Sequence, residues 1–274
     1  MRIMKLTARQ IKNFRRKVDA AYKKQRRVFP WRQTKDPYHI LVSEIMLQQT
    51  QADRVVSKYL EFVKKFPTAK SLAVSPLADV LRVWQGLGYN RRAKMLQNAA
   101  RLIVEVYQGQ VPDSIEALQK LPGVGPYTAR AVMAFAYDRP SVFIETNIRT
   151  VFIHEFFRHQ KKVADSQLLP LIAQTLKANR PGEWYLALMD YGAVLKRLYK
   201  NPSRRSTQYV RQSKFNGSTR QIRGAIIREL SAHHRLTARQ LFSSLSFDTL
   251  RVQAALADLV AEGLIRRQKK VYFL

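Results

Sequence analysis

The segment Leu121–Ala129, with the sequence LPGVGPYTA, carries the clearest chemical pattern in the chain. Its two glycines, Gly123 and Gly125, are followed by Thr128 at the start of an apolar segment. Glycine permits positive φ angles, and such a turn leaves N–H groups bare at a helix N-terminus, where a phosphate can bind. A plain turn between two helices is the alternative. The strong positive charge of the chain favours the phosphate-binding interpretation.

The charge of the 274-residue chain is large and unevenly distributed, with 49 Lys and Arg against 19 Asp and Glu, a formal net charge of +30. Residues 1–32 carry 12 basic and 1 acidic side chains, and residues 196–274 carry 17 and 4. The middle of the chain carries 20 and 14. Polycationic flanks indicate a polyanionic partner, and nucleic acid is the usual one. A membrane surface is the rival, but the flanks lack the aromatic and leucine-rich face that it requires.

The chain contains no cysteine, which excludes disulfides, thiol catalysis, zinc–thiolate sites and cysteine-ligated iron–sulfur clusters. Its five histidines show no metal-ligand spacing. No apolar run approaches the roughly 18 residues of a membrane span, and the N-terminus lacks the apolar segment of a signal peptide. We therefore expect a cytoplasmic protein, associated with the nucleoid. An apolar content of 46% supports a sizeable core, and the length predicts two domains.

Apolar residues recur mostly at helical spacing, and strand signals are almost absent before the C-terminus, so the fold class is predicted to be mainly α. Phe14 and Val18 illustrate the pattern in the basic first flank. Pro67 and Gly86-Leu87-Gly88 interrupt it and mark helix ends. The expected helices are Ile11–Tyr22, two within Tyr38–Phe66, Leu72–Trp84, Arg91–Tyr107, Ile115–Lys120, Thr128–Tyr137, Ile148–Phe157, Leu168–Ala178 and Trp184–Tyr199.

A polar, basic segment with almost no periodicity, residues 201–217, predicts a linker before a small C-terminal domain. The expected order after it is three helices, at Ile222–Leu230, Thr237–Leu245 and Val252–Val260, and two strands, Leu264-Ile265 and Val271–Phe273, around a basic tip, Arg266–Lys270. Gly263 stops the third helix. This order is typical of a winged helix. A helical cap with a solvated hairpin is the plainer alternative.

LPGVGPYTA resembles the helix-hairpin-helix motif of the DNA glycosylase superfamily that includes endonuclease III. Other motifs resemble the MutY-type A/G-specific adenine DNA glycosylases. They are Pro30-Trp31, Pro37-Tyr38, SEIMLQQTQ at Ser43–Gln51, WQGLGYNRRA at Trp84–Ala93 and MDYGA at Met189–Ala193. The resemblance covers about residues 8–200. It implies a two-lobed helix-hairpin-helix glycosylase domain over residues 1–200, with the linker at 201–217 and the winged-helix-like domain at 218–274.

The resemblance places Glu44 where MutY-type enzymes keep the glutamate that protonates the departing purine. Cleavage of an N-glycosidic bond leaves a cationic sugar and an anionic base, so one carboxylic acid and one carboxylate are needed. Glu44 lies on an otherwise apolar helix with Ile45 and Met46, where desolvation is expected to raise its pKa toward a useful value. A glutamate on a helix surface is the alternative.

The second carboxylate departs from the family pattern. Glu145 stands where the family has aspartate, and Asn147 matches the family's asparagine two residues later. Glutamate keeps the charge and adds one methylene, whereas catalytic groups need placement to about 0.5 Å. We expect Glu145 to stabilise the sugar cation or to guide the attacking water, with Asn147 beside it.

Tyr127 stands where bifunctional glycosylase/lyase relatives carry a lysine that forms a Schiff base. A tyrosine cannot form that imine. The resemblance therefore implies a monofunctional enzyme, which releases the base and leaves an abasic site. Lys120 lies before the turn and is not expected to replace the missing lysine.

A base inside a duplex must be flipped out before it can react, and the enzyme usually fills the vacated space. Gln48, Gln49 and Tyr89 match the family's duplex-probing positions, and Leu87 matches more loosely. A glutamine can pair with the orphaned base, and a tyrosine can wedge between stacked bases. The alternative for Tyr89 is a packing contact. The remaining expected DNA-binding residues, from the same motifs and the hairpin, are Thr50, Arg91, Gly123, Gly125 and Thr128.

Family members carry four cysteines after the Asp-x-Gly-Ala segment, and these hold a [4Fe–4S] cluster. The residues at those positions here are Lys196, Ser203, Ser206 and Gln212. We expect no cluster and no metal site, apart from room for a monovalent cation at the hairpin. Arg204 and Arg205 in the same loop could contact phosphates. The family's terminal domain, which reads 8-oxoguanine, is replaced by the winged-helix-like domain.

Taken together, the residues and the resemblance predict a monomeric, monofunctional DNA glycosylase of base excision repair that acts on double-stranded DNA. Its expected reaction is hydrolysis of the N-glycosidic bond of adenine mispaired with 8-oxoguanine or guanine. One alternative is a mismatch thymine/uracil glycosylase. The other is a non-catalytic protein that scans duplexes. Asp190 is expected only to brace the helix end near Gly192.

Overall fold

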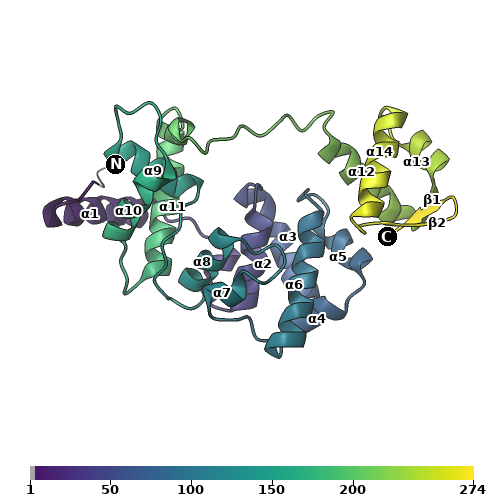
Figure 1. Cartoon of the computed structure of the whole chain (residues 1–274), viewed down its shortest axis with the longest axis horizontal. Coiled ribbons are helices and arrows are strands. Elements are labelled where there is room, and N and C mark those ends of the chain that lie inside the picture. Colours follow the sequence, from purple (N-terminus) through teal and green to yellow (C-terminus); the bar gives the residue numbers. More distant parts are fainter. Residues whose placement is uncertain (1–3) are drawn as a thin grey trace. The chain divides into compact units, whose positions relative to one another are not determined.

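The computed structural model describes residues 4–274, and it confirms the mainly α architecture (Figure 1). Within these residues the chain forms fourteen α-helices, two short 3-10 helices and three short strands. The glycosylase domain expected from residue 1 thus has its first three residues outside the described part.

The helices group into two compact units that interleave along the chain. Unit 1 comprises the chain up to Ile40 together with residues 113–119 and 124–211. Unit 2 comprises residues 41–112, 120–123 and 212–274. The expected limits of the linker, residues 201 and 217, stay a prediction.

Unit 1 is built almost entirely from helices. Its elements are α1 (Ala8–Gln25), η1 (Pro30–Arg32), the start of α2 (Pro37–Leu47), α7 (Ile115–Leu118), α8 (Pro126–Phe135), α9 (Thr146–Phe156), α10 (Asp165–Thr175), α11 (Pro181–Leu198) and η2 (Pro202–Arg205). The residues at the beginning of several of these helices explain where each helix starts. Thr7 and Gln10 form a capping box before α1, and prolines open α8 and α11, where a helix needs no N–H donor.

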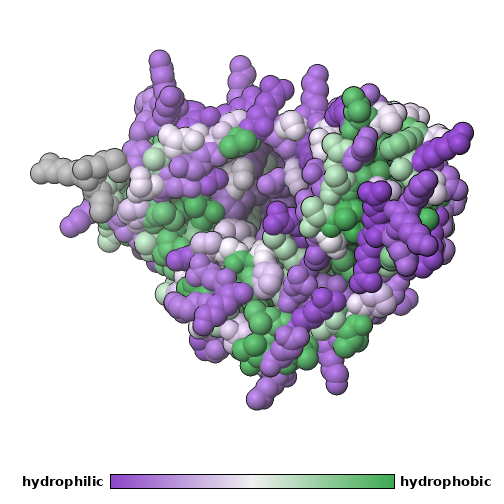
Figure 2. Space-filling view, turned by 45° about the vertical axis from the view of Figure 1, so that its right-hand side comes forward, coloured by the Kyte–Doolittle hydropathy of each residue, from purple (hydrophilic) through white to green (hydrophobic). Residues whose placement is uncertain are grey.

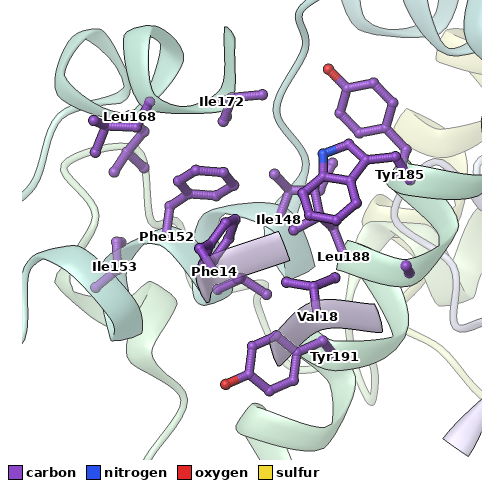
Figure 3. Close-up of a cluster of buried hydrophobic side chains, with 14 of the residues drawn as sticks. Phe14, Val18, Ile148, Phe152, Ile153, Leu168, Ile172, Tyr185, Leu188 and Tyr191 are labelled. Carbon is purple, nitrogen blue, oxygen red and sulfur yellow. The ribbon is translucent and has the colours of Figure 1, made fainter. Parts of the chain in front are cut away.

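The core of unit 1 forms where α1, α9 and α11 bring their apolar faces together (Figure 3). The ring of Phe14 lies 5.3 Å from that of Phe152 and 6.0 Å from that of Trp184, measured between centroids. A Cβ atom at Gly192 would lie only 2.2 Å from the carbonyl oxygen of Asn147. Glycine at this position therefore permits the close approach of α11 to the start of α9.

Unit 2 joins four helices of the first half of the chain to the C-terminal residues. Its elements are the end of α2, α3 (Ala52–Lys65), α4 (Ala69–Val74), α5 (Leu77–Trp84), α6 (Arg91–Tyr107), α12 (Thr219–His233), β1 (Arg235–Thr237), α13 (Ala238–Ser244), α14 (Thr249–Ala261), β2 (Arg266–Gln268) and β3 (Val271–Phe273). Trp84 is fully buried and packs edge-on against Phe62, with ring centroids 5.9 Å apart. The expected single helix over Leu72–Trp84 is two helices, because Ser75-Pro76 adopts extended backbone between them.

The C-terminal residues fold as three helices and a small antiparallel sheet in the order β1-β3-β2, a winged-helix-like arrangement. The strand Val271–Phe273 is confirmed as β3, whereas β1 was not expected and the first strand of the hairpin was misplaced. Strand β1 pairs with β3 but is too short to show an alternating pattern in the sequence. The second error concerns Leu264-Ile265, which are buried before the sheet, while the strand lies over Arg266–Gln268 and the turn falls at Lys269.

No helix within residues 4–274 is both long enough and apolar enough to cross a membrane. Hydrophilic side chains, many of them long, cover most of the face shown in Figure 2, with smaller apolar areas between them. This surface agrees with a chain in which a quarter of the residues are charged.

Candidate functional site

Glu44 lies near the end of α2 within unit 2, and its side chain is only 6% exposed. The residues around it on the helix, Val42, Ile45 and Met46, are fully buried. A helix that is apolar on every side belongs to a core, and a carboxyl group there has been moved out of water. The expected placement of Glu44 on an apolar helix is therefore confirmed, and the helix-surface alternative is wrong.

Arg92, which the sequence analysis did not single out, connects the two loops that carry the expected DNA-probing residues. Its guanidinium donates hydrogen bonds to the carbonyl oxygens of Ile45, Met46 and Gln48 at 2.6–2.8 Å. The other terminal nitrogen reaches Thr50 Oγ1 at 3.0 Å and the Gly88 carbonyl at 3.2 Å. Burial lowers the pKa of Arg92 to about 10. The only sequence signal was its place inside the WQGLGYNRRA motif.

Gln48, Gln49 and Thr50 form the loop after α2. Gln48 Nε2 donates to the carbonyl oxygen of Gly123 at 3.2 Å, so this loop touches the hairpin residue within unit 2. Gln49 has φ of +56°, a left-handed conformation that a non-glycine residue rarely adopts. Strained backbone of this kind is concentrated at binding and catalytic sites.

Tyr89 follows a loop with two left-handed glycines, Gly86 and Gly88, and is itself left-handed with φ of +49°. Its ring lies 5.5 Å from the guanidinium carbon of Arg92. Arg91 is exposed at the start of α6. Leu87, by contrast, is only 3% exposed, so in this structure it belongs to the core and not to a DNA-facing surface.

Of the two glycines in the hairpin Leu121–Ala129, only one has the left-handed backbone expected for a tight turn. Gly123 has φ of +83°, and a Cβ there would lie 3.1 Å from Met95 Cβ. Gly125 has an ordinary extended backbone and caps α8, which begins at Pro126 and not at Thr128. Thr128 is buried in the first turn. The N-terminal end of a helix is a favourable place for a phosphate.

Glu145 is the N-cap residue of α9 in unit 1. Its Oε1 accepts hydrogen bonds from the backbone N–H groups of Asn147 at 2.8 Å and Ile148 at 3.1 Å. Its Oε2 accepts from Asn147 Nδ2 at 3.4 Å. Helix N-termini favour negative charge and capping normally falls to shorter side chains, so the extra methylene is used to fold the carboxylate back onto the helix.

Lys196 completes this arrangement from α11. Its Nζ donates to Asn147 Oδ1 at 2.7 Å, which leaves the Asn147 amide nitrogen facing Glu145. Burial lowers the pKa of Lys196, and the negative charge of Glu145 opposes that shift. The sequence indicates Lys196 only as a position without the family's cysteine, because its partner Asn147 is far away in the sequence.

Tyr127 lies in the first turn of α8, where its ring packs edge-on against Phe143 with centroids 5.6 Å apart. It is half-buried beside the unit 1 core. Lys120 is exposed and lies before the turn. These placements agree with a residue that fills space next to the expected catalytic segment.

The four positions that carry cluster-binding cysteines in the family cannot supply thiolates here, so the donor set does not fit a [4Fe–4S] cluster. The loop is held by protein hydrogen bonds. Arg205 donates to the carbonyl oxygens of Phe157 and Arg158, both at 2.7 Å, and to those of Gln160 and Ile153 at 3.2 and 3.3 Å. Among residues 4–274, no group of three or more His, Asp or Glu could hold a metal ion. A monovalent cation at the hairpin stays a prediction.

Asp190 is a second buried carboxylate in unit 1, only 1% exposed, with a structural environment. It accepts two hydrogen bonds from the Arg32 guanidinium, at 2.9 and 3.0 Å, and others from the side chain and backbone of Arg27. Burial acts to raise its pKa, but the contacts with Arg32 and Arg27 outweigh burial and hold the pKa below its ordinary value. Asp190 thus braces α11 against the segment after α1.

The buried glutamate, the glycine hairpin before α8 and the capped carboxylate at α9 together define the helix-hairpin-helix class of DNA glycosylases. Comparison with known proteins agrees. Residues 42–174 match the family described as "HhH-GPD superfamily base excision DNA repair protein". The adenine DNA glycosylase of Mycobacterium tuberculosis is 34% identical over 90% of this chain and 88% of its own length.

Solved structures give the same fold. A thermostable thymine-DNA glycosylase superposes with a TM-score of 0.60 and 30% identity, covering 67% of this chain and 86% of its own. An endonuclease III–DNA covalent intermediate also gives 0.60, at 19% identity, over 69% and 88%. The chain belongs to the HhH-GPD superfamily of base excision DNA repair proteins, and within it to the adenine DNA glycosylase family. It is a DNA N-glycosylase.

Proposed function

We propose that this protein removes adenine from mispairs in double-stranded DNA by hydrolysing the N-glycosidic bond. The observation that carries the proposal is Glu44, an acidic side chain buried among apolar residues in the motif SEIMLQQTQ. The relative from M. tuberculosis, whose name states adenine DNA glycosylase activity, supports the choice of base. Endonuclease III structures with DNA support a duplex substrate.

In the proposed reaction Glu44 is the general acid. As a carboxylic acid held in a largely buried position, it would deliver its proton to the adenine ring. The bond between the sugar C1′ and the adenine nitrogen breaks, and its electron pair stays with the protonated base. Water then adds to C1′ and loses a proton, which leaves an abasic site.

Glu145 has the complementary role of stabilising the positive charge that develops on the sugar. Two backbone N–H groups and the Asn147 amide hold its oxygens in place. Asn147 fixes the position of the carboxylate. A group that is already oriented contributes more to a transition state than one that must reorganise.

The proposed enzyme is monofunctional, because Tyr127 stands where a Schiff-base lysine is needed and its ring packs against Phe143. DNA contacts are assigned to Gln48, Gln49, Thr50, Tyr89 and Arg91, to the hairpin glycines Gly123 and Gly125, and to the backbone of Thr128 in the first turn of α8, because the Thr128 side chain is buried. Leu87 can take part only if its loop rearranges, since its side chain is buried. We also propose that the protein acts as a monomer in the cytoplasm.

The test is a single-turnover excision assay on duplexes with adenine opposite 8-oxoguanine, adenine opposite guanine, thymine opposite guanine and uracil opposite guanine. Products are scored with and without alkali, so that base release and strand cleavage are separated. Adenine release that becomes visible only after alkali is the expected result. A protein–DNA adduct trapped by borohydride would contradict the monofunctional assignment.

A mismatch thymine/uracil glycosylase is the second candidate, and one observation favours it. The thermostable thymine-DNA glycosylase is 30% identical to this chain, and the superposition covers 86% of that protein. Release of thymine or uracil in place of adenine in the same assay would select this candidate. DNA binding without release of any base would select the non-catalytic scanning protein.

A further inference from the structure

The probing residue Tyr89 is contacted by the linker and by α12 within unit 2. Gln212 Nε2 donates a hydrogen bond to the Tyr89 hydroxyl at 2.6 Å. Arg220 Nη1 donates to the same oxygen at 2.8 Å, and its guanidinium carbon lies 5.3 Å from the ring centroid. With Arg92 at 5.5 Å, two guanidinium groups contact the same ring. The Tyr89 side chain is therefore fixed at its ring and at its hydroxyl.

Arg220 is itself held in place. Its Nη2 donates to the carbonyl oxygen of Ser213 at 2.7 Å and to Ser213 Oγ at 3.1 Å. Ser213 is next to Gln212, so the linker supplies both a direct contact to Tyr89 and the support for Arg220. Arginine presents a rigid planar fork of donors, which suits simultaneous contacts of this kind.

A second set of contacts fixes the C-terminal residues against α6. Lys94 Nζ donates to the Glu262 carbonyl at 2.5 Å, and the Glu262 carboxylate forms two hydrogen bonds with Arg223 at 2.9 and 2.6 Å. Gly263 is left-handed, and a Cβ there would lie 2.6 Å from Lys94 Nζ. The residue that follows α14 therefore contacts α6, and the start of α12 is bonded to that same residue.

These contacts enclose a cavity of about 330 Å³. Its lining includes probing residues and C-terminal residues together, among them Gln48, Gln49, Tyr89, Arg220, Arg223 and Glu262. The C-terminal domain therefore contributes side chains directly beside the loops that we assign to duplex probing.

Charge indicates what these contacts do. The groups bonded to Tyr89 are the amide of Gln212 and the cation Arg220, which phosphates attract, and the nearby Glu262 carboxylate is paired with Arg223. The helix that reads DNA in winged helices corresponds to α14. Its exposed side chains include Leu250, Gln253 and Asp258, and Arg251 is bonded to the Gly217 carbonyl. The structure thus favours support of Tyr89 over groove reading by α14.

We propose that Arg220, assisted by Gln212, is a positioning residue for Tyr89, through which the winged-helix-like domain presents the tyrosine to the duplex. This inference rests on the proposed function, because it assumes that Tyr89 enters DNA when a base is flipped. Its consequence is that Arg220 lowers the barrier to base flipping and leaves bond cleavage itself unchanged.

The test compares Arg220→Met with Arg228→Met in the full-length protein. Arg228 is exposed on the same helix, so its loss removes the same charge without touching Tyr89. Single-turnover excision is measured for adenine opposite 8-oxoguanine in a duplex and for the same adenine inside a bubble of unpaired bases. We expect Arg220→Met to slow duplex excision by about tenfold and bubble excision by less than about twofold. We expect Arg228→Met to behave like the unmodified protein, and Arg220→Lys to recover part of the rate.

A double-mutant cycle with Tyr89→Phe sharpens the test, since that substitution removes only the hydroxyl that accepts the bond from Arg220. The two losses should be less than additive if they report one contact. Equal slowing on duplex and bubble, or fully additive losses, would overturn the proposal.

A further measurement distinguishes failure of this inference from failure of the proposed function. The fluorescence of 2-aminopurine beside the target adenine reports unstacking without any base release. Arg220→Met should reduce the fluorescence increase on binding, and an unchanged increase would refute the positioning role. A protein that releases no adenine would refute the proposed function while this readout still decides the role of Arg220.

Discussion

Glu44 and Glu145 carry the same carboxyl group in opposite surroundings. Glu44 is 6% exposed on a helix whose neighbouring side chains are fully buried and apolar. Glu145 caps the start of α9, where it accepts two backbone hydrogen bonds and a third from the Asn147 amide. One carboxyl group is therefore placed by burial and the other by helix capping.

The difference shows that the fold holds two chemically identical side chains in two different ways. Enzymes that use two carboxyl groups commonly place each in a different environment. Here the two environments come from different units of the fold. The comparison therefore predicts that replacing each glutamate with glutamine lowers the excision rate by a different factor.

The largest effect is expected for Glu44→Gln, which removes the proton donor while keeping the shape of the side chain. Loss of a general acid should lower the single-turnover rate by roughly 10²–10⁴-fold. Binding to the mispaired duplex should remain, since glutamine adds no bulk. Glu61→Gln, an exposed change on α3, serves as the control and should keep the full rate.

Asp190→Asn tests whether a buried carboxylate outside the proposed chemistry behaves differently. It leaves Arg32, itself buried, without its ionic partner, so we expect a loss of about 3–5 kcal/mol of unfolding free energy, read from urea denaturation. The rate per folded molecule should be unchanged. The exposed pair between Lys35 and Asp138 provides the control, and Asp138→Asn should cost at most about 1 kcal/mol.

The contact between Asp190 and Arg32 also makes the free energy of unfolding depend on pH. The pKa of Asp190 is lowered on folding, so the folded state keeps the carboxylate where the unfolded chain would already bind a proton. Its contribution is complete above the ordinary aspartate value of 3.8 and is lost as the pH falls below it. Asp190→Asn should remove this dependence, and an unchanged acid profile would contradict the assignment.

Glu145→Gln should lower the excision rate on the order of 10²-fold, because the electrostatic stabilisation of the sugar cation is lost. The glutamine oxygen can still accept the two backbone hydrogen bonds, so the melting temperature should change little. A nearly normal excision rate would contradict the catalytic role of Glu145, which would then only cap the helix.

The smallest effect is expected for Lys196→Met, which leaves Asn147 Oδ1 without its donor. We expect a loss of up to about tenfold in the single-turnover rate, because the amide that orients the Glu145 carboxylate is no longer fixed. Burial lowers the pKa of Lys196, so its charged form opposes folding and the variant should not be less stable at neutral pH. Lys161→Met, an exposed change in unit 1, should move neither readout.

Much of the fold was accessible from local sequence. Helical spacing of apolar residues predicts most helices to within a few residues, since amphipathic periodicity is a property of consecutive positions. The strands were less accessible. Each contains three residues, and β1 exists only because it pairs with β3 at the far end of the C-terminal domain.

Motifs likewise indicated Glu44, Glu145 and Tyr89, but did not show which groups Arg92, Arg205 and Arg220 would contact. A guanidinium can donate to any carbonyl or hydroxyl within reach, and the sequence does not show which groups will be near. Arg220 lies 131 positions from Tyr89, and Arg205 lies about 50 from the carbonyl groups that it holds.

The sequence by itself thus determined the chemical inventory of this protein: the absence of thiolates, a glutamate within an apolar helical segment, a glycine-containing turn and the net charge of +30. Only the tertiary structure decided how the inventory is arranged. It turned Glu145 back onto its own helix, placed Lys196 on Asn147 and brought the C-terminal domain onto Tyr89. Residue type and helical period are local, whereas hydrogen-bond partners are chosen by packing between distant segments.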